Sequence, residues 1–114
     1  MDYAVINKDE LRRDGSNYEF EGYLYGDTGV SLIWVDLPPG DGPRLHKHPY
    51  AEVFIVQEGQ ATYTVGANVL EVTAGQVVIA PPNVPHKFTN SGTRPLRQVD
   101  IHLSKQFITE WLED

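Results

Sequence analysis

Residues 40–59 read Gly-Asp-Gly-Pro-Arg-Leu-His-Lys-His-Pro-Tyr-Ala-Glu-Val-Phe-Ile-Val-Gln-Glu-Gly. This stretch joins an imidazole pair to an apolar run of strand length, and a glycine stands at each end. Side chains two residues apart on an extended strand point to the same face, so His46 and His48 are expected to share one face. Glu52 has the same parity if the backbone stays extended past Pro49. The stretch therefore predicts two imidazoles and a carboxylate on one side of a strand.

The rest of the chain alternates short β-type runs with glycine and proline. The predicted strands cover residues 18–25, 30–37, 51–57, 60–65, 68–73, 76–80, 85–90 and 95–103. Residues 105–113 carry Phe107, Ile108, Trp111 and Leu112 at helical spacing, which predicts a short amphipathic C-terminal helix. We expect an all-β sandwich or barrel of jelly-roll type that forms one domain over residues 1–114. Its parts would be an arm or short helix over residues 1–17, a barrel over 18–104 and the helix over 105–113.

Composition narrows the function classes. The chain has 114 residues, no cysteine and a formal net charge of −7. A metal would therefore need nitrogen and oxygen ligands, and an acidic chain without a basic stripe is a poor partner for nucleic acid or anionic lipid. The apolar runs are too short to span a bilayer, and the first residues do not resemble a signal peptide, so we expect a cytoplasmic protein.

The chain has only four histidines, namely His46, His48, His86 and His102. A lone His-x-His pair in a β-rich protein also occurs at the surface or in packing. His86 would have to reach the pair from another strand, which a closed barrel allows. Three imidazoles and one carboxylate suit Fe, Mn, Co, Ni, Cu or Zn as a divalent ion, and four ligands on a six-coordinate ion leave two positions open.

The spacing of glycines and prolines around these residues resembles the cupin family. Residues 40–59 match the first cupin motif, G-x5-H-x-H-x3-E-x6-G, and residues 75–90 match the second, G-x5-P-x-G-x2-H-x3-N, with one departure. Asn83 stands where the family usually has glycine, and asparagine tolerates positive φ better than most residues. The resemblance covers nearly half of the chain. It implies a cupin-type jelly-roll β-barrel with a metal held by His46, His48, Glu52 and His86, and small cupins of this kind often pair as homodimers.

Other residues are candidates for the surroundings of the metal. Arg44, Tyr50, Phe54, Phe88 and Asp100 are expected to line a substrate site. The last predicted strand alternates Gln98, Asp100 and His102 with Val99, Ile101 and Leu103, and either set could face inward. If the polar set faces inward, His102 is a candidate general base or an outer-shell donor.

Three functions are compatible with this pattern. The first is a metal-dependent enzyme acting on a small organic molecule, of the dioxygenase, isomerase or decarboxylase type. The second is a small-molecule binding or sensor module without chemistry. The third is a degenerate barrel without metal, against which the complete ligand set argues.

Overall fold

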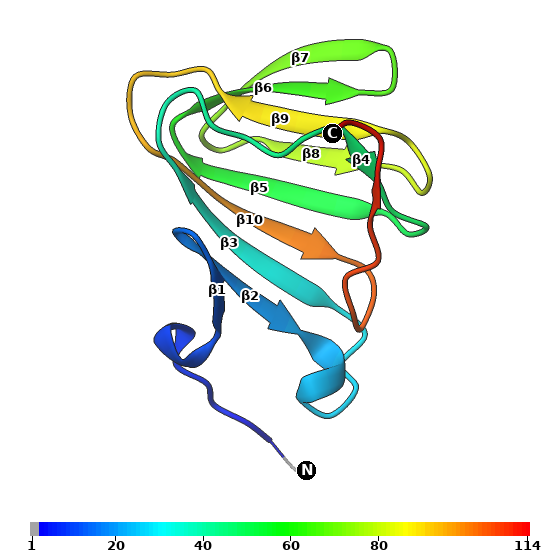
Figure 1. The fold of residues 1–114 in the computed structure, drawn as a ribbon. Helices are drawn as coiled ribbons and strands as arrows, with labels where there is room; N and C mark the ends of the chain where they lie inside the picture. The colour runs from blue at the N-terminus through cyan, green and yellow to red at the C-terminus, as the bar shows by residue number, and fades with distance from the viewer. Residues whose placement is uncertain (1–2) are drawn as a thin grey trace.

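Two antiparallel β-sheets face each other in the computed structural model, which describes residues 3–114 (Figure 1). The larger sheet has the strand order β1 (Arg12–Asp14), β2 (Asn17–Glu21), β3 (Ser31–Leu37), β10 (Leu96–His102), β5 (Glu52–Glu58) and β8 (Val77–Ala80). The smaller sheet has the order β11 (Glu110–Trp111), β4 (His46–Lys47), β9 (His86–Asn90), β6 (Gln60–Val65) and β7 (Asn68–Thr73). This architecture confirms the all-β prediction.

The core lies between the two sheets, because apolar side chains alternate with polar ones along the central strands. Along β5, for example, Phe54 and Val56 are buried while Ile55 between them is exposed. The buried apolar cluster consists of Val35, Phe54, Val56, Ala61, Tyr63, Val72, Val78, Ala80, Phe88 and Leu96. The core fills the space between the sheets and reaches His86 at Phe54, whose ring centroid lies 5.6 Å from that of His86.

Most predicted strands agree with the observed ones to within one residue at each end. The predicted strand over residues 18–25 is the exception, because β2 ends at Glu21 and a 3-10 turn follows over Gly22–Leu24. The Gly22 carbonyl accepts hydrogen bonds from the amides of Tyr25 and Thr28, at 3.0 and 3.2 Å. A Cβ atom at Gly22 would lie 1.9 Å from the Thr28 carbonyl oxygen, so the glycine permits a turn that aromatic neighbours conceal in the sequence.

The predicted helix over residues 105–113 is wrong. This segment is extended, and Glu110 and Trp111 form β11, which pairs with Lys47 and His46 of β4. The Leu112 amide also donates to the Leu45 carbonyl at 2.9 Å. A segment this short is a marginal helix by itself, so backbone pairing with the open edge of β4 outweighs the helical spacing of its apolar residues.

The predicted N-terminal arm contains a 3-10 turn, η1 (Lys8–Glu10), and the edge strand β1. β1 pairs with β2, and Arg12 forms ion pairs with Glu19 at 2.9 Å and with Glu21 at 2.7 Å.

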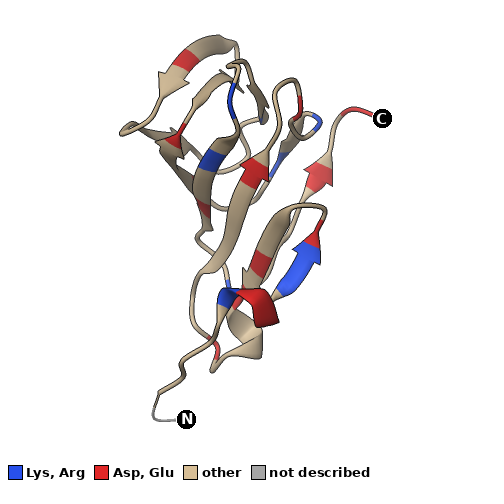
Figure 2. Cartoon of the chain, turned by 90° about the vertical axis from the view of Figure 1, so that its left-hand side faces the viewer, with Lys and Arg blue, Asp and Glu red and all other residues tan. Residues whose placement is uncertain are grey.

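Acidic and basic residues are scattered over several strands and do not gather into one stripe (Figure 2). No helix in the described part of the chain is long and apolar enough to cross a membrane.

Candidate metal centre

Two cross-strand pairs, one from each sheet, bring the site together. In the smaller sheet His46 on β4 lies opposite His86 on β9, and in the larger sheet Glu52 on β5 lies opposite His102 on β10. His48 follows β4 directly, and its ring centroid lies 5.1 Å from that of His86 and 4.7 Å from that of His102. All five side chains are buried, with at most 7% of any residue exposed. The predicted candidates are therefore gathered at one point between the sheets.

Backbone carbonyls fix the tautomer of three imidazoles. Nδ1 of His46 lies 2.6 Å from the Arg44 carbonyl, and Nδ1 of His86 lies 3.0 Å from the Val84 carbonyl. Nδ1 of His48 lies 2.8 Å from the carbonyl of Ile108. A carbonyl only accepts hydrogen bonds, so each Nδ1 must carry the proton, and in the neutral ring each Nε2 presents a lone pair.

These lone pairs converge on a carboxylate. Nε2 of His48 and Nε2 of His86 lie 3.0 and 3.1 Å from Oε1 of Glu52. Burial lowers the pKa of His46 to about 4, so this ring is neutral at pH 7. Among the described residues, Nε2 of His48 is a buried nitrogen without a hydrogen bond of acceptable geometry. An arrangement of acceptors that face one another is repulsive unless a cation or protons lie between them.

The dimensions suit one divalent ion. The four donor atoms of His46, His48, Glu52 and His86 all lie within 4.8 Å of one another. Ligands about 2.1 Å from a common ion are at most about 4.2 Å apart, so a small inward movement would complete such a shell. The donor set therefore fits a divalent metal with three nitrogen ligands and one oxygen ligand, and it does not discriminate among the transition metals.

His102 supports Glu52 from the opposite side. The Tyr50 hydroxyl accepts a hydrogen bond from the Ile108 amide at 3.2 Å, so its own proton is free to be donated to Nδ1 of His102 at 2.7 Å. Nε2 of His102 then carries a proton and faces Oε2 of Glu52 at 3.1 Å. Burial by itself would raise the pKa of Glu52, but the neighbouring imidazoles of His102, His48 and His86 outweigh it and hold that pKa well below its usual range. Glu52 is thus a carboxylate with Oε2 held and Oε1 directed at the imidazoles.

The loop that leads into β4 is packed against β9. A Cβ atom on Gly42 would lie 1.9 Å from the Phe88 carbonyl oxygen, so only glycine allows this approach. The Gly40 amide donates to the Asn90 carbonyl at 2.9 Å, and the Asn90 side chain donates to the carbonyls of Leu37 and Arg94 at 2.9 and 2.8 Å. These contacts join Gly40 of the first sequence motif to Asn90 of the second. They also fix the distance between the strands that carry His46 and His86.

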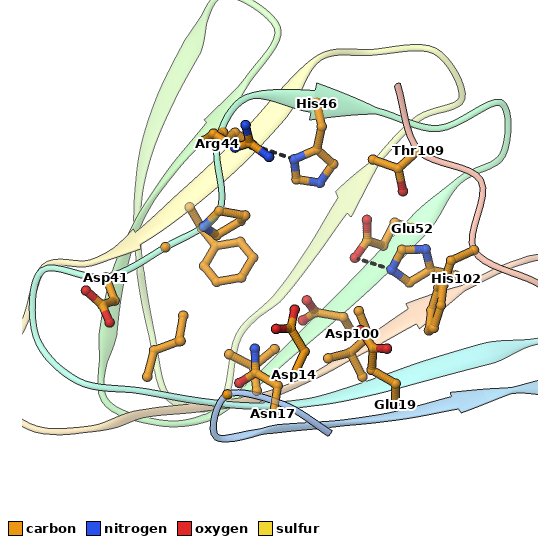
Figure 3. A pocket seen from close by; sticks show the side chains of 18 of the residues that line it. Asp14, Asn17, Glu19, Asp41, Arg44, His46, Glu52, Asp100, His102 and Thr109 are labelled. Atoms are coloured by element: carbon orange, nitrogen blue, oxygen red, sulfur yellow. Dashed lines mark hydrogen bonds and ion pairs between the residues drawn. The ribbon is translucent and has the colours of Figure 1, made fainter. Parts of the chain in front are cut away.

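A cavity of about 520 Å³ opens from the centre (Figure 3). Its lining includes His46, His48, Glu52 and His102 together with Arg44, Phe88 and Asp100. The turn between β1 and β2 borders it as well, so Asp14 and Asn17 face the same space. The Arg44 guanidinium lies 4.7 Å from the centroid of the Trp111 ring. The cavity is large enough for a small organic molecule.

A row of buried polar residues along β10 faces the interior. The Tyr63 hydroxyl donates to Oε1 of Gln98 at 2.7 Å, and Nε2 of Gln98 donates to Oδ1 of Asp100 at 2.7 Å. Burial, reinforced by the Glu52 carboxylate, raises the pKa of Asp100 well above its usual range, and the Gln98 hydrogen bond offsets this only in part. The sequence left the inward face of this strand open. The structure turns the polar face, Gln98, Asp100 and His102, toward the site.

The structure also separates some of the predicted lining residues. Phe54 lies in the core beneath the site, with its ring centroid 5.6 Å from that of His86, and Tyr50 lies behind His102. Neither is among the residues that line the cavity.

The residues after β10 contribute to the site, although the sequence pattern does not predict this. The ring centroid of Phe107 lies 4.8 Å from that of His102, and the ring centroid of Trp111 lies 5.0 Å from that of His46. Oγ1 of Thr109 lies 3.3 Å from Nδ1 of His48. Their helical spacing pointed away from this role.

Comparison with known proteins places the chain in a family. Residues 33–102, more than half of the chain, match the cupin domain. The chain therefore belongs to the cupin family, as both motifs predicted. The match ends at His102, and the residues that follow lie outside the matched region.

Individual relatives have different activities. The chain is 36% identical to H2HPP isomerase of Bacillus subtilis over 67% of its own length and 32% of the relative's. It is 27% identical to the HTH-type transcriptional regulator PuuR of Escherichia coli over 91% of its own length and 58% of the relative's. The chain spans about a third to three fifths of the length of the first three curated relatives it matches.

A solved structure of Bacillus subtilis oxalate decarboxylase, studied for its Mn(II) centres, has the same fold. It superposes with a TM-score of 0.77 at 24% identity, over 84% of this chain and 27% of the decarboxylase chain. At this level of identity the comparison establishes the fold.

Proposed function

We propose that the chain binds one divalent transition metal ion through His46, His48, Glu52 and His86, and that it is an enzyme acting on a small organic molecule at that ion. One observation carries the first part. Three imidazole nitrogens and a carboxylate oxygen converge in a buried site, with the tautomers of all three rings fixed by carbonyls on the far side. Orientation of this kind by outer hydrogen bonds is typical of metal-binding histidines.

The cavity supports the second part of the proposal. A bound divalent ion would act as a Lewis acid that polarises an oxygen-bearing substrate. The chain adds apolar side chains that include Phe88, a guanidinium at Arg44, and an interior carboxylic acid at Asp100. Asp100 can supply a proton, and His102 keeps Glu52 in position. These groups are compatible with decarboxylation, isomerisation or dioxygenation, and the relatives include a decarboxylase and an isomerase.

Metal analysis is the first test. Protein made without an affinity tag and without added nickel should contain close to one equivalent of a transition metal per chain, measured by inductively coupled plasma mass spectrometry. The variant His86→Ala should lose it. Lys47→Ala, on the same strand as His46 and with an exposed partner in Glu110, is the matched control and should keep it. Full metal content in His86→Ala would refute the ligand assignment.

Turnover is the second test. The metal-loaded protein should be assayed for dioxygen uptake, carbon dioxide release and isomerisation with a panel of dicarboxylic acids, hydroxy acids, diketones and diols. An alternative is a binding module without chemistry, which similarity to a transcriptional regulator favours. In that case ligands would raise the melting temperature without forming product.

We also propose that the chain forms a homodimer through the outer face of the larger sheet. Neighbouring strands β5 and β8 place Val53 opposite Ile79 and Ile55 opposite Val77 on this face. Ile79 is 62% exposed and Val77 is 58% exposed, and Val99 and Ile101 of β10 continue the apolar surface. Contiguous exposed apolar surface of this kind marks interfaces, and in a two-fold dimer the same face of each copy is buried against the other.

Light scattering after size exclusion tests the dimer. The unmodified chain should have twice the mass of one chain, and Ile79→Glu should be monomeric. Val69→Glu, at a similarly exposed valine on β7 of the other sheet, is the control and should stay dimeric. A monomeric unmodified chain at about 100 μM would contradict the proposal. A cytoplasmic location stays a prediction.

A further inference from the structure

The segment Phe107–Asp114, which we call the strap, follows β10 and runs from the larger sheet to the edge of β4 (Figure 1). We propose that the strap is part of the metal centre and that its Ile108 carbonyl is the group that positions His48 as a ligand. This inference rests on the proposed metal binding and adds a positioning element that lies outside residues 33–102, which match the cupin domain.

The orienting contacts of the three histidines differ in origin. His46 and His86 each use the carbonyl two residues before them, from Arg44 and Val84, so their orientation is built into their own segments. His48 uses Ile108, which is 60 residues away in sequence, and Thr109 adds a second oxygen at 3.3 Å. Among the three histidines of the ligand set, His48 is therefore the one whose orienting carbonyl belongs to the strap.

The strap is held in place by contacts at both ends. The Phe107 amide donates to Oε2 of Glu21 at 3.0 Å. At the other end, the Leu112 amide donates to Leu45 at 2.9 Å, and Glu113 accepts from the Leu45 amide at 2.8 Å and pairs with Lys87 at 3.2 Å. Between these ends the Ile108 amide donates a hydrogen bond to the Tyr50 hydroxyl. The strap is thus fixed to both sheets while it presents its Ile108 carbonyl to His48.

A folded protein without the strap should keep three metal donors and lose the fixed orientation of the fourth. Loss of an outer-shell partner typically weakens metal binding about tenfold to a hundredfold. Two variants make this change. One ends after Phe107, and the other, Leu112→Pro, keeps the full length but removes the amide that ties the strap to Leu45. Glu110→Gln is the matched control, because it removes only an exposed ion pair with Lys47 at 3.6 Å.

Cobalt(II) is the probe, since its visible absorption spectrum reports the ligand set as well as the affinity. We expect both strap variants to bind cobalt(II) about tenfold to a hundredfold more weakly, with spectra shifted toward that of His48→Ala. Glu110→Gln should match the unmodified chain. Circular dichroism checks that each variant is folded, and Leu112→Pro carries the test if the shortened chain is not.

A double-mutant cycle separates positioning from general stability. If the strap acts through His48, its removal should not weaken cobalt(II) binding further in the His48→Ala background. Unchanged affinity and spectrum in a folded strap variant would overturn the inference, and so would an equal loss with and without His48. Absence of cobalt(II) binding to the unmodified chain would instead refute the proposed metal site itself.

Discussion

The Tyr50 hydroxyl lies 2.7 Å from Nδ1 of His102, although 52 residues separate the two in sequence. Because this contact makes His102 a donor to Glu52, the phenol indirectly controls which carboxylate oxygen is free for a metal. Burial raises the pKa of Tyr50 to about 12, so the phenol stays protonated throughout the working range of pH.

Tyr50→Phe should weaken metal binding. The substitution removes the donor to Nδ1, so His102 can take the other tautomer and turn an acceptor toward Glu52. We expect about a tenfold loss in affinity for zinc(II) or cobalt(II), measured by competition with a chelator. Tyr23→Phe, at a half-exposed tyrosine outside the cavity, should leave the affinity unchanged. Equal affinities for all three proteins would show that the phenol does not orient the site.

The metal-free protein should lose stability as the pH falls from about 6.5 to about 4. The pKa of His46 is lowered from 6.5 to about 4 in the folded state, so over this interval the unfolded chain binds a proton that the folded chain does not. The lowered pKa of Glu52 acts in the same direction below its ordinary value of 4.5. The His46 contribution is at most about 3 kcal/mol. Urea unfolding at several pH values measures it, and His46→Asn should flatten the curve in that interval.

Asp100 should make the protein less stable as the pH rises, which is opposite to the effect of His46. Its raised pKa means that the folded chain holds a proton that the unfolded chain has released above its ordinary pKa of 3.8, so this group costs stability as the pH rises. Asp100→Asn keeps an acceptor for Gln98 and removes the titration. The variant should therefore gain stability relative to the unmodified chain as the pH rises above 3.8. A difference in the free energy of unfolding that does not change with pH would contradict the assignment.

Asn83 has a φ of 63°, in the left-handed region that the family glycine at this position allows. Its amide donates to the His48 carbonyl at 2.7 Å, so the turn is joined to the ligand segment. Asn83→Ala should destabilise the protein by about 1 kcal/mol, because alanine tolerates this conformation less well, while Asn83→Gly should be close to neutral. Thermal unfolding of the two variants side by side tests this, and an alanine variant as stable as the glycine variant would count against it.

Much of the architecture was predictable from local signals. The alternation of apolar residues and the glycine and proline positions located β6 and β7 to the residue, and the motif spacing gathered His46, His48, Glu52 and His86 into one set. These signals are local or have fixed spacing, so a single sequence carries them.

The parts that sequence could not predict depend on contacts between distant segments. The alternation of polar and apolar residues along β10 is compatible with either face pointing inward. The polar face points inward because Gln98 accepts a hydrogen bond from the Tyr63 hydroxyl across the core, and these residues are 35 positions apart. The strap was predicted as a helix because Phe107 and Trp111 have helical spacing. Its conformation is decided by the open edge of β4 and by the rings of His46 and His102, which no pattern within residues 105–113 reveals.

The four donors come from both layers of the molecule, with Glu52 on the larger sheet and His46 and His86 on the smaller one. In a chain without cysteine, an ion held by these donors would serve as the cross-link that a disulfide provides elsewhere. Metal loading should then suppress separation of the layers as a whole. Amide hydrogen exchange in β5 and β9 would slow together, although the two strands lie in different sheets.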